Sequence, residues 1–220
     1  ASNVIEAANT CKVKKVIALS TDKAASPINL YGATKLCSDK LFIAANNYAG
    51  DKQIVFSVVR YGNVMNSRGS VVPAFMKMKK KNEISITDKN MTRFNISLKE
   101  GVNFVLRSLK LAQGGEIFIP KLPSYRILDL AKAIAPTAKI KVIGVRQGEK
   151  IDEELITKSE ATNSLEFKDF YVIFPSGKSE IKRKYLKNLK GKTLKNNFSY
   201  NSRDNKYLSV NQLKKLIRKT

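Results

Sequence analysis

Histidine is absent from the 220 residues of this chain. Its absence excludes Ser-His triads, histidine acid/base catalysis and nearly every kind of zinc site, so we expect no metal centre. Any catalysis must therefore use Asp, Glu, Lys, Tyr, Ser, Thr or Cys. The two cysteines, Cys11 and Cys37, form neither a CxxC pair nor a disulfide framework, which favours a reducing, cytoplasmic setting.

Long apolar runs are also absent. No stretch approaches the roughly 18 residues that a membrane-spanning helix requires. Polar residues interrupt the start of the chain at Asn3, Glu6 and Asn9, so we expect no signal peptide. G-x-G-x-x-G is missing as well, since the glycines of "GNVMNSRG" are too far apart.

Acidic residues are scarce, and the formal net charge is +23. Residues 177–220 hold 14 Lys or Arg against 2 Asp or Glu, so they are predicted to form a basic C-terminal extension. Lysine exceeds arginine 32 to 9, beside abundant Asn and Ile, a mixture that biased genome composition also produces. We therefore expect no nucleic-acid partner, although such a charge is typical of proteins that bind one.

The apolar content and the order of helix and strand patterns predict an α/β fold. Apolar residues make up 43% of the chain, enough for a substantial core. Helical and strand patterns alternate, which indicates a parallel sheet covered by helices. Gly50 is expected to end the second helix, and "DKNMTRF" is expected to be a loop. We predict helices over 2–11, 30–48, 71–80, 97–112, 126–135 and 149–155, and strands over 13–19, 54–61, 83–87, 116–120, 140–145 and 170–175.

The stretch "LSTDKAASPINLYGATK" concentrates chemistry-bearing residues. Tyr31 and Lys35 are four apart on a predicted helix and share a face, and a nearby lysine favours a phenolate that can exchange protons near neutral pH. Y-x-x-x-K alone also arises by chance. "STDK" directly follows a predicted buried strand, and ligands of open α/β sheets bind at the carboxyl ends of strands. Asp22 beside Lys23 can act as an acid and a base, or form only an exposed ion pair in a turn.

Five blocks that span nearly the whole chain carry a family resemblance: "ALSTDKAASPINLYGATKLCSDKLF", "VVRYGNVMNSRGSVVPAF", "ITDKNMTRF", "GVRQGEKIDEELI" and "YNSRDNKYLSVNQL". Together they resemble the extended short-chain dehydrogenase/reductase superfamily, and within it the nucleotide-sugar 4,6-dehydratases. The most similar members are the C5-inverting UDP-N-acetylglucosamine 4,6-dehydratases, which open the pseudaminic acid pathway for flagellin and surface glycans. Tyr31 favours this type, because the membrane-bound, non-inverting relatives tend to carry Met there.

The resemblance implies a bound NADP that is reduced transiently. It implies that Tyr31 takes the 4-OH proton of the sugar, Lys23 removes the C5 proton and Asp22 protonates the departing 6-OH. Thr21 would hydrogen-bond the sugar near C4, and Lys35 would hold the nicotinamide ribose. The proton returned to C5 could come from Tyr31, Lys23 or water. Cofactor contacts are expected from Tyr31, Lys35, Ser20, Tyr61 and Gly62, and substrate contacts from Asn63, Arg68, Arg93, Arg146 and Glu149.

Members of this family begin with a glycine-rich turn that cradles the NADP pyrophosphate. The 220 residues lack that turn, so we expect them to correspond to the C-terminal two-thirds of such an enzyme and to bind NADP weakly on their own. The expected organisation is a partial Rossmann domain over 1–67 and 98–121, a substrate lobe over 68–97 and 122–176, and the extension 177–220. A homo-oligomer is expected from the family. The alternatives are an epimerase or reductase of the same fold, against which Asp22-Lys23 argues, and an inactive remnant.

Overall fold

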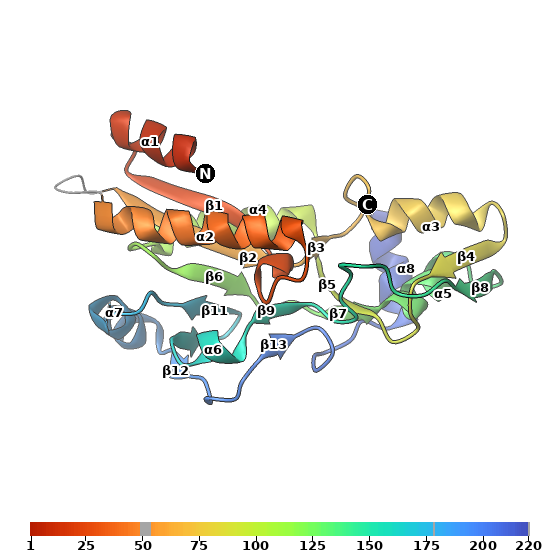
Figure 1. The fold of residues 1–220 in the computed structure, drawn as a ribbon. Helices are drawn as coiled ribbons and strands as arrows, with labels where there is room; N and C mark the ends of the chain where they lie inside the picture. The colour runs from red at the N-terminus through yellow and green to blue at the C-terminus, as the bar shows by residue number, and fades with distance from the viewer. Residues whose placement is uncertain (49–53, 178, 220) are drawn as a thin grey trace. The chain divides into compact units, whose positions relative to one another are not determined.

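The computed structural model describes residues 1–48, 54–177 and 179–219 (Figure 1). Contacts within the chain divide it into two compact units. Unit 1 comprises Ala1–Tyr61, Val102–Lys121 and Glu154–Ser199. Unit 2 comprises Gly62–Gly101, Leu122–Glu153 and Tyr200–Thr220. Each unit is therefore assembled from separated segments of the chain.

Unit 1 is built on a sheet with the strand order β1-β2-β6-β11-β10-β12. β1 pairs in parallel with β2, from Lys15 opposite Val55 to Thr21 opposite Tyr61, and β2 pairs in parallel with β6. The remaining strands are antiparallel to their neighbours. The predicted parallel α/β fold is thus confirmed, with an antiparallel extension that the sequence did not reveal. The strands are β1 (Lys15–Thr21), β2 (Val55–Tyr61), β6 (Ile117–Pro120), β11 (Phe170–Ile173), β10 (Ser164–Glu166) and β12 (Lys192–Thr193).

Helices cover both faces of this sheet because successive side chains of a strand point to opposite sides. On one face, Phe42 of α2 (Leu30–Tyr48) packs on Phe56 of β2, with ring centroids 6.2 Å apart. On the other face, Phe104 of α4 (Leu98–Leu111) joins a buried cluster with Val59 and Phe118. Unit 1 also contains α1 (Ser2–Thr10), the 3-10 helix η1 (Asp22–Ala24), β9 (Glu154–Ile156), α6 (Lys158–Ala161) and α7 (Ser179–Leu189).

Unit 2 has its own apolar core. Among the described residues its strands include the sheet β3-β5-β7 and the parallel pair β4-β8. Phe75, Ile84, Ile86, Leu130 and Leu213 are buried together in the core. The elements are β3 (Asn63–Val64), α3 (Val71–Lys79), β4 (Glu83–Ile86), β5 (Thr92–Ile96), β7 (Ser124–Arg126), α5 (Ile127–Ile134), β8 (Lys139–Val142), β13 (Tyr200–Asn201) and α8 (Val210–Lys219).

The basic segment at the end of the chain contributes Tyr185 to the core of unit 1 and Leu213 to the core of unit 2. In α7, the Tyr185 hydroxyl donates to the Leu111 carbonyl at 2.7 Å and to Glu116 Oε1 at 3.1 Å. In α8, Leu213 is fully buried in unit 2. Both helices are therefore anchored by apolar or aromatic side chains, while Lys184, Lys187 and Lys215 are exposed. No helix in the described part of the chain has the length and apolar character that crossing a bilayer requires.

Two local predictions are wrong. Part of the predicted loop "DKNMTRF" belongs to β5, and residues 149–155, predicted to be helical, contain no helix and lead into β9. The reason lies in Arg93, whose guanidinium takes the carbonyls of Lys150 and Ile151 that a helix would use internally. The most periodic elements agree with prediction within one or two residues at most ends. The predicted end of α2 at Gly50 lies outside the described residues.

Candidate active site

The end of β1 carries a compact polar cluster. Thr21 Oγ1 donates to Asp22 Oδ1 at 3.0 Å, and Lys23 Nζ lies 3.1 Å from the same oxygen. The Asp22 side chain is 1% exposed, whereas that of Lys23 is 31% exposed. Because the chain turns tightly through η1 immediately after the strand, neighbouring residues can direct their side chains at one another. The predicted acid and base thus form a close ion pair at the carboxyl end of a parallel strand, where ligands of such sheets bind.

The helix that carries Tyr31 begins against this cluster. Asn29 caps α2, since its Oδ1 accepts the Gly32 amide at 2.8 Å. A Cβ added to Gly32 would lie 2.3 Å from the Lys23 carbonyl oxygen, so only glycine permits this approach of α2 to η1. Gly32 was not among the residues predicted for the site. A glycine in the first turn of a helix, a position where it is unfavourable, was the available signal. The Tyr31 side chain nearby is 56% exposed.

The residues predicted to contact the cofactor divide into accessible and buried ones. Lys35 Nζ donates to the Leu19 carbonyl of β1 at 2.7 Å. Burial raises the pKa of Tyr61, and its neighbour Tyr31 raises it further. Ser20, by contrast, is buried, and its hydroxyl donates to Asp39 Oδ2 at 2.8 Å. Lys35 is half-buried and Tyr31 is exposed, whereas the Ser20 hydroxyl is engaged inside unit 1.

A buried charged network lies behind the cluster, and sequence reasoning missed it. Arg60 of β2 is fully buried, with NH2 3.4 Å from Asp39 Oδ2 and NH1 3.1 Å from both Glu160 carboxylate oxygens. NH1 also donates to the Leu155 carbonyl at 3.1 Å. Burial raises the pKa of Asp39, against the lowering effects of Arg60 and the Ser20 hydroxyl. The available signal was Asp39 itself, a charged residue one turn beyond Lys35 on the same helix face.

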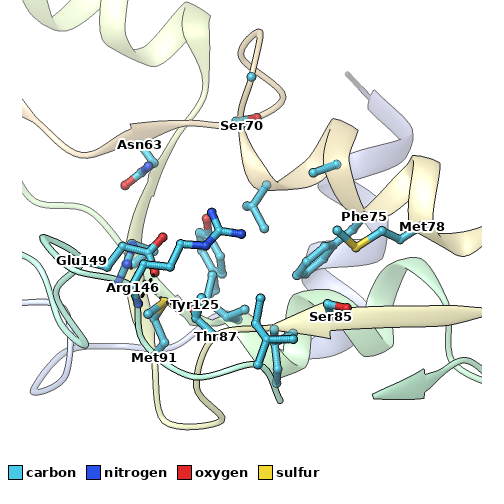
Figure 2. A pocket seen from close by; sticks show the side chains of 17 residues that line it. Asn63, Ser70, Phe75, Met78, Ser85, Thr87, Met91, Tyr125, Arg146 and Glu149 are labelled. Carbon is cyan, nitrogen blue, oxygen red and sulfur yellow. Dashed lines mark hydrogen bonds between the residues drawn. The ribbon is translucent and has the colours of Figure 1, made fainter. Parts of the chain in front are cut away.

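Unit 2 contains a cavity of about 300 Å³ that gathers most of the predicted substrate residues. Asn63, Arg93, Arg146 and Glu149 line it. In Figure 2 Asn63, Arg146 and Glu149 lie toward one end of the cavity, and Phe75 and Met78 lie toward the other. Among the residues that the structure describes, neither Arg68 nor Gly62 lines this cavity. The cavity therefore offers one polar end and one apolar end, which suits a ligand of mixed character.

Arg93 is largely occupied within the protein. NH1 donates to the Thr92 and Ile151 carbonyls at 2.6 and 3.0 Å, and NH2 donates to the Lys150 carbonyl at 2.9 Å. Its Nε lies 3.7 Å from Glu153 Oε1. In this arrangement Arg93 ties β5 to the segment that follows Glu149. A direct contact with substrate phosphates, the predicted role, would require some of these hydrogen bonds to be exchanged.

Comparisons with known proteins agree with the fold and the motifs. The family model described as "Polysaccharide biosynthesis protein" matches residues 1–175. A "UDP-N-acetylglucosamine 4,6-dehydratase (inverting)" from Campylobacter jejuni subsp. jejuni serotype O:2 is 51% identical over 227 residues, covering 100% of this chain and 68% of the relative. A "UDP-glucose 4-epimerase" from Rickettsia canadensis is 38% identical over 99% of this chain and 65% of its own length.

A solved structure extends the likeness to three dimensions. The X-ray structure of Pen from Bacillus thuringiensis is 36% identical and superposes with a TM-score of 0.87, covering 99% of this chain and 66% of that one. The chain thus spans about two thirds of the length of these relatives. The predicted resemblance is confirmed: the chain is similar over its whole length to inverting UDP-N-acetylglucosamine 4,6-dehydratases, and it belongs to the polysaccharide biosynthesis protein family.

Proposed function

We propose that this chain carries the chemistry of a nucleotide-sugar 4,6-dehydratase that converts UDP-N-acetylglucosamine, with inversion at C5, into a UDP-4-keto-6-deoxy-hexosamine. The observation that supports it most is the Asp22–Lys23 pair at 3.1 Å, held against the helix of Tyr31 and Lys35. An acid and a base on adjacent residues suit the removal of water from neighbouring carbons. The 51% identity to inverting dehydratases supports the same activity.

The ion pair also suggests how the protons circulate. An ion pair of this kind consists of an ammonium and a carboxylate, whereas elimination needs an amine on Lys23 and a carboxylic acid on Asp22. Transfer of one proton along their 3.1 Å hydrogen bond produces that form. Lys23 then takes the C5 proton and Asp22 protonates the departing 6-OH, which leaves as water. These two transfers restore the original ammonium and carboxylate, so the elimination needs no other proton donor.

The cofactor that fits this site is a nicotinamide dinucleotide, and we propose NADP. Its chemistry is to accept a hydride from C4 of the sugar and to return it at C6. Lys35 and Tyr31 fit a ribose and a reacting 4-OH, since both are partly accessible at the carboxyl end of β1. Tyr31 would hold the 4-OH proton, and the Thr21 hydroxyl would orient the sugar. Ser20 fits poorly as a cofactor contact because its hydroxyl is buried against Asp39.

We assign the uridine diphosphate portion of the substrate to the cavity of unit 2. Arg146 offers a fork of donors that suits phosphate oxygens, and Glu149 offers acceptors for ribose hydroxyls. The apolar end formed by Phe75 and Met78 suits the flat face of a base. The product would feed the synthesis of pseudaminic acid for flagellin and surface glycans.

The test incubates the purified protein with UDP-N-acetylglucosamine and a large excess of NADP, because these residues are expected to bind NADP weakly, and follows the sugar nucleotide by mass spectrometry. Loss of water is expected, and in deuterium oxide C5 should become deuterated with either stereochemical outcome, so the C5 configuration is read from the NMR couplings of the product formed in ordinary water. Lys23→Met should abolish water loss. Lys121→Met is the matched control. Lys121 also forms an ion pair, with Glu166 at 2.6 Å, and its side chain is 29% exposed, similar to the 31% of Lys23.

The outcomes separate the alternatives. An isomer of unchanged mass would support a 4-epimerase instead, the activity named for the Rickettsia relatives. Water loss that survives Lys23→Met would contradict the assignment of the base. A parent protein that produces neither change would overturn the proposed function.

A further inference from the structure

The network behind the polar cluster connects four separate elements of unit 1. Ser20 is the last residue but one of β1, Arg60 is the last but one of β2, Asp39 lies on α2 and Glu160 lies on α6. Ser20 and Arg60 are register partners in the parallel pair β1–β2. Asp39 Oδ2 accepts both the Ser20 hydroxyl and the Arg60 guanidinium, at 2.8 and 3.4 Å. Two strands and a helix are therefore joined at a single carboxylate oxygen.

Each end of this junction leads directly to a residue of the proposed chemistry. Ser20 immediately precedes Thr21, so its position sets where the Asp22–Lys23 pair begins. Asp39 follows Lys35 by four residues and Tyr31 by eight, which places all three on one face of α2. In Figure 1, α2 runs alongside β1 and β2, with η1 near its first turn. The hydrogen bond from Ser20 to Asp39 thus links the two groups of reacting residues through buried atoms.

The physical character of the network favours a role in geometry. A buried ion pair adds little net stability compared with well-packed apolar residues, because both charges lose water. It does, however, tolerate few arrangements, since guanidinium and carboxylate must meet with correct directions and distances. Burial raises the pKa of Asp39, whereas Arg60 and Ser20 lower it, so its ionised form depends on these contacts.

We propose that Ser20, Asp39, Arg60 and Glu160 are positioning residues that fix the distance between the Asp22–Lys23 pair and Tyr31. The inference rests on the proposed function and deepens it, by giving the buried Ser20 a role other than the predicted cofactor contact. Glu160 completes the arrangement, because it holds Arg60 through NH1 and closes the capping box of α6 with Thr157. Arg60 is thus held from two sides, by Asp39 and by Glu160.

The experiment compares Ser20→Ala with Ser57→Ala. Ser57 is a matched control because it is also a buried strand serine of unit 1, and its hydroxyl donates at 2.7 Å to a buried carboxylate, Glu116. Both variants therefore lose one equivalent hydrogen bond. Ser20→Ala should lower kcat for water loss at least tenfold and leave KM for UDP-N-acetylglucosamine within twofold. Ser57→Ala should leave both within twofold, and Ser20→Thr, which restores a hydroxyl, should recover most of kcat.

Hydrogen–deuterium exchange supplies a readout that does not need activity. Ser20→Ala should speed exchange of the amides over 21–25 and 30–36 at least tenfold, and Ser57→Ala should not. If the parent removes no water, the proposed function fails, while exchange still decides whether the network holds this region. Equal effects of the two alanine variants on kcat and exchange would overturn the proposal. If Ser20→Ala does not fold, Glu160→Gln, which is expected to show the same split between kcat and KM, replaces it.

Discussion

The close contact between α2 and η1 makes Gly32→Ala a sharp test of the site. The new Cβ would lie 2.3 Å from the Lys23 carbonyl oxygen and 3.1 Å from Pro27 Cβ. The first obstacle is a backbone atom, which cannot rotate away. Restoring the 3.0 Å that real Cβ atoms keep requires a shift of about 0.7 Å between the start of α2 and η1. Tyr31 would therefore move relative to Lys23.

The expected effect is large on catalysis and small on stability. A displacement approaching 1 Å at reacting groups lowers rates by as much as about a hundredfold, so kcat for water loss should fall between about tenfold and a hundredfold. Alanine is favoured over glycine in a helix by about 1 kcal/mol, which offsets part of the about 1–3 kcal/mol of overpacking. We expect a net loss near 1 kcal/mol in urea denaturation.

Gly101→Ala is the matched control, since Gly101 is also a helical glycine near a helix start. Its added Cβ would meet Ile96 Cδ1 at 3.8 Å, an ordinary contact. This variant should gain up to about 1 kcal/mol and keep its kcat. The reasoning is refuted if Gly32→Ala retains the parent kcat while remaining folded, because the contact would then not determine the geometry of the site.

Three further predictions concern buried and exposed carboxylates. Glu116→Gln should destabilise unit 1 by about 3 kcal/mol in urea denaturation. Glu116 accepts four hydrogen bonds within 3.1 Å, and the NH2 group of a glutamine would point at groups that are themselves donors. A loss under about 1 kcal/mol would contradict this prediction. The hydrogen bond from Arg107 lowers the pKa of Asp169, so this group stabilises the fold above about pH 4 and loses that effect as the pH falls through its lowered pKa. In Asp169→Asn, the free energy of unfolding should therefore fall less steeply with pH on the acid side than in the parent. The difference should be less than about 1 kcal/mol, because the pair is exposed, and an unchanged pH dependence would refute the prediction. Burial raises the pKa of Asp39, so its contribution to the free energy of unfolding is full below about pH 4 and is lost as the pH rises through the raised pKa. The stability of Asp39→Asn relative to the parent should therefore increase from about pH 4 to about pH 7. A difference that stays constant over this range would count against the prediction.

Local patterns in the sequence predicted much of the fold because they reflect local physics. The β-branched run before Tyr61 formed β2, and Ser97 with Glu100 capped α4, with the Ser97 amide donating to Glu100 Oε2 at 2.8 Å. Apolar positions at helical spacing likewise predicted α2, the helix that carries Tyr31 and Lys35. In each of these cases the determining residues are close together along the chain.

Features that depend on distant residues were not predictable in this way. Residues 149–155 look helical until Arg93, more than fifty positions earlier, takes two of their carbonyls. Ser20 looks like a surface residue of a ligand site until Asp39 and Arg60 are seen beside it. Periodicity and motif spacing carry no information on such partners, which only the folded chain brings together.

The interleaving of the two units has a consequence for folding. β1 and β2 lie within one continuous segment, but β6 and β11 come more than fifty and more than one hundred residues later in the chain. The sheet of unit 1 therefore cannot be completed until most of the chain has emerged from the ribosome. Such non-local strand pairing is slow, and the waiting edge of β2 is open to wrong partners in the meantime. We accordingly expect expression at low temperature, or with chaperones in excess, to raise the yield of folded protein.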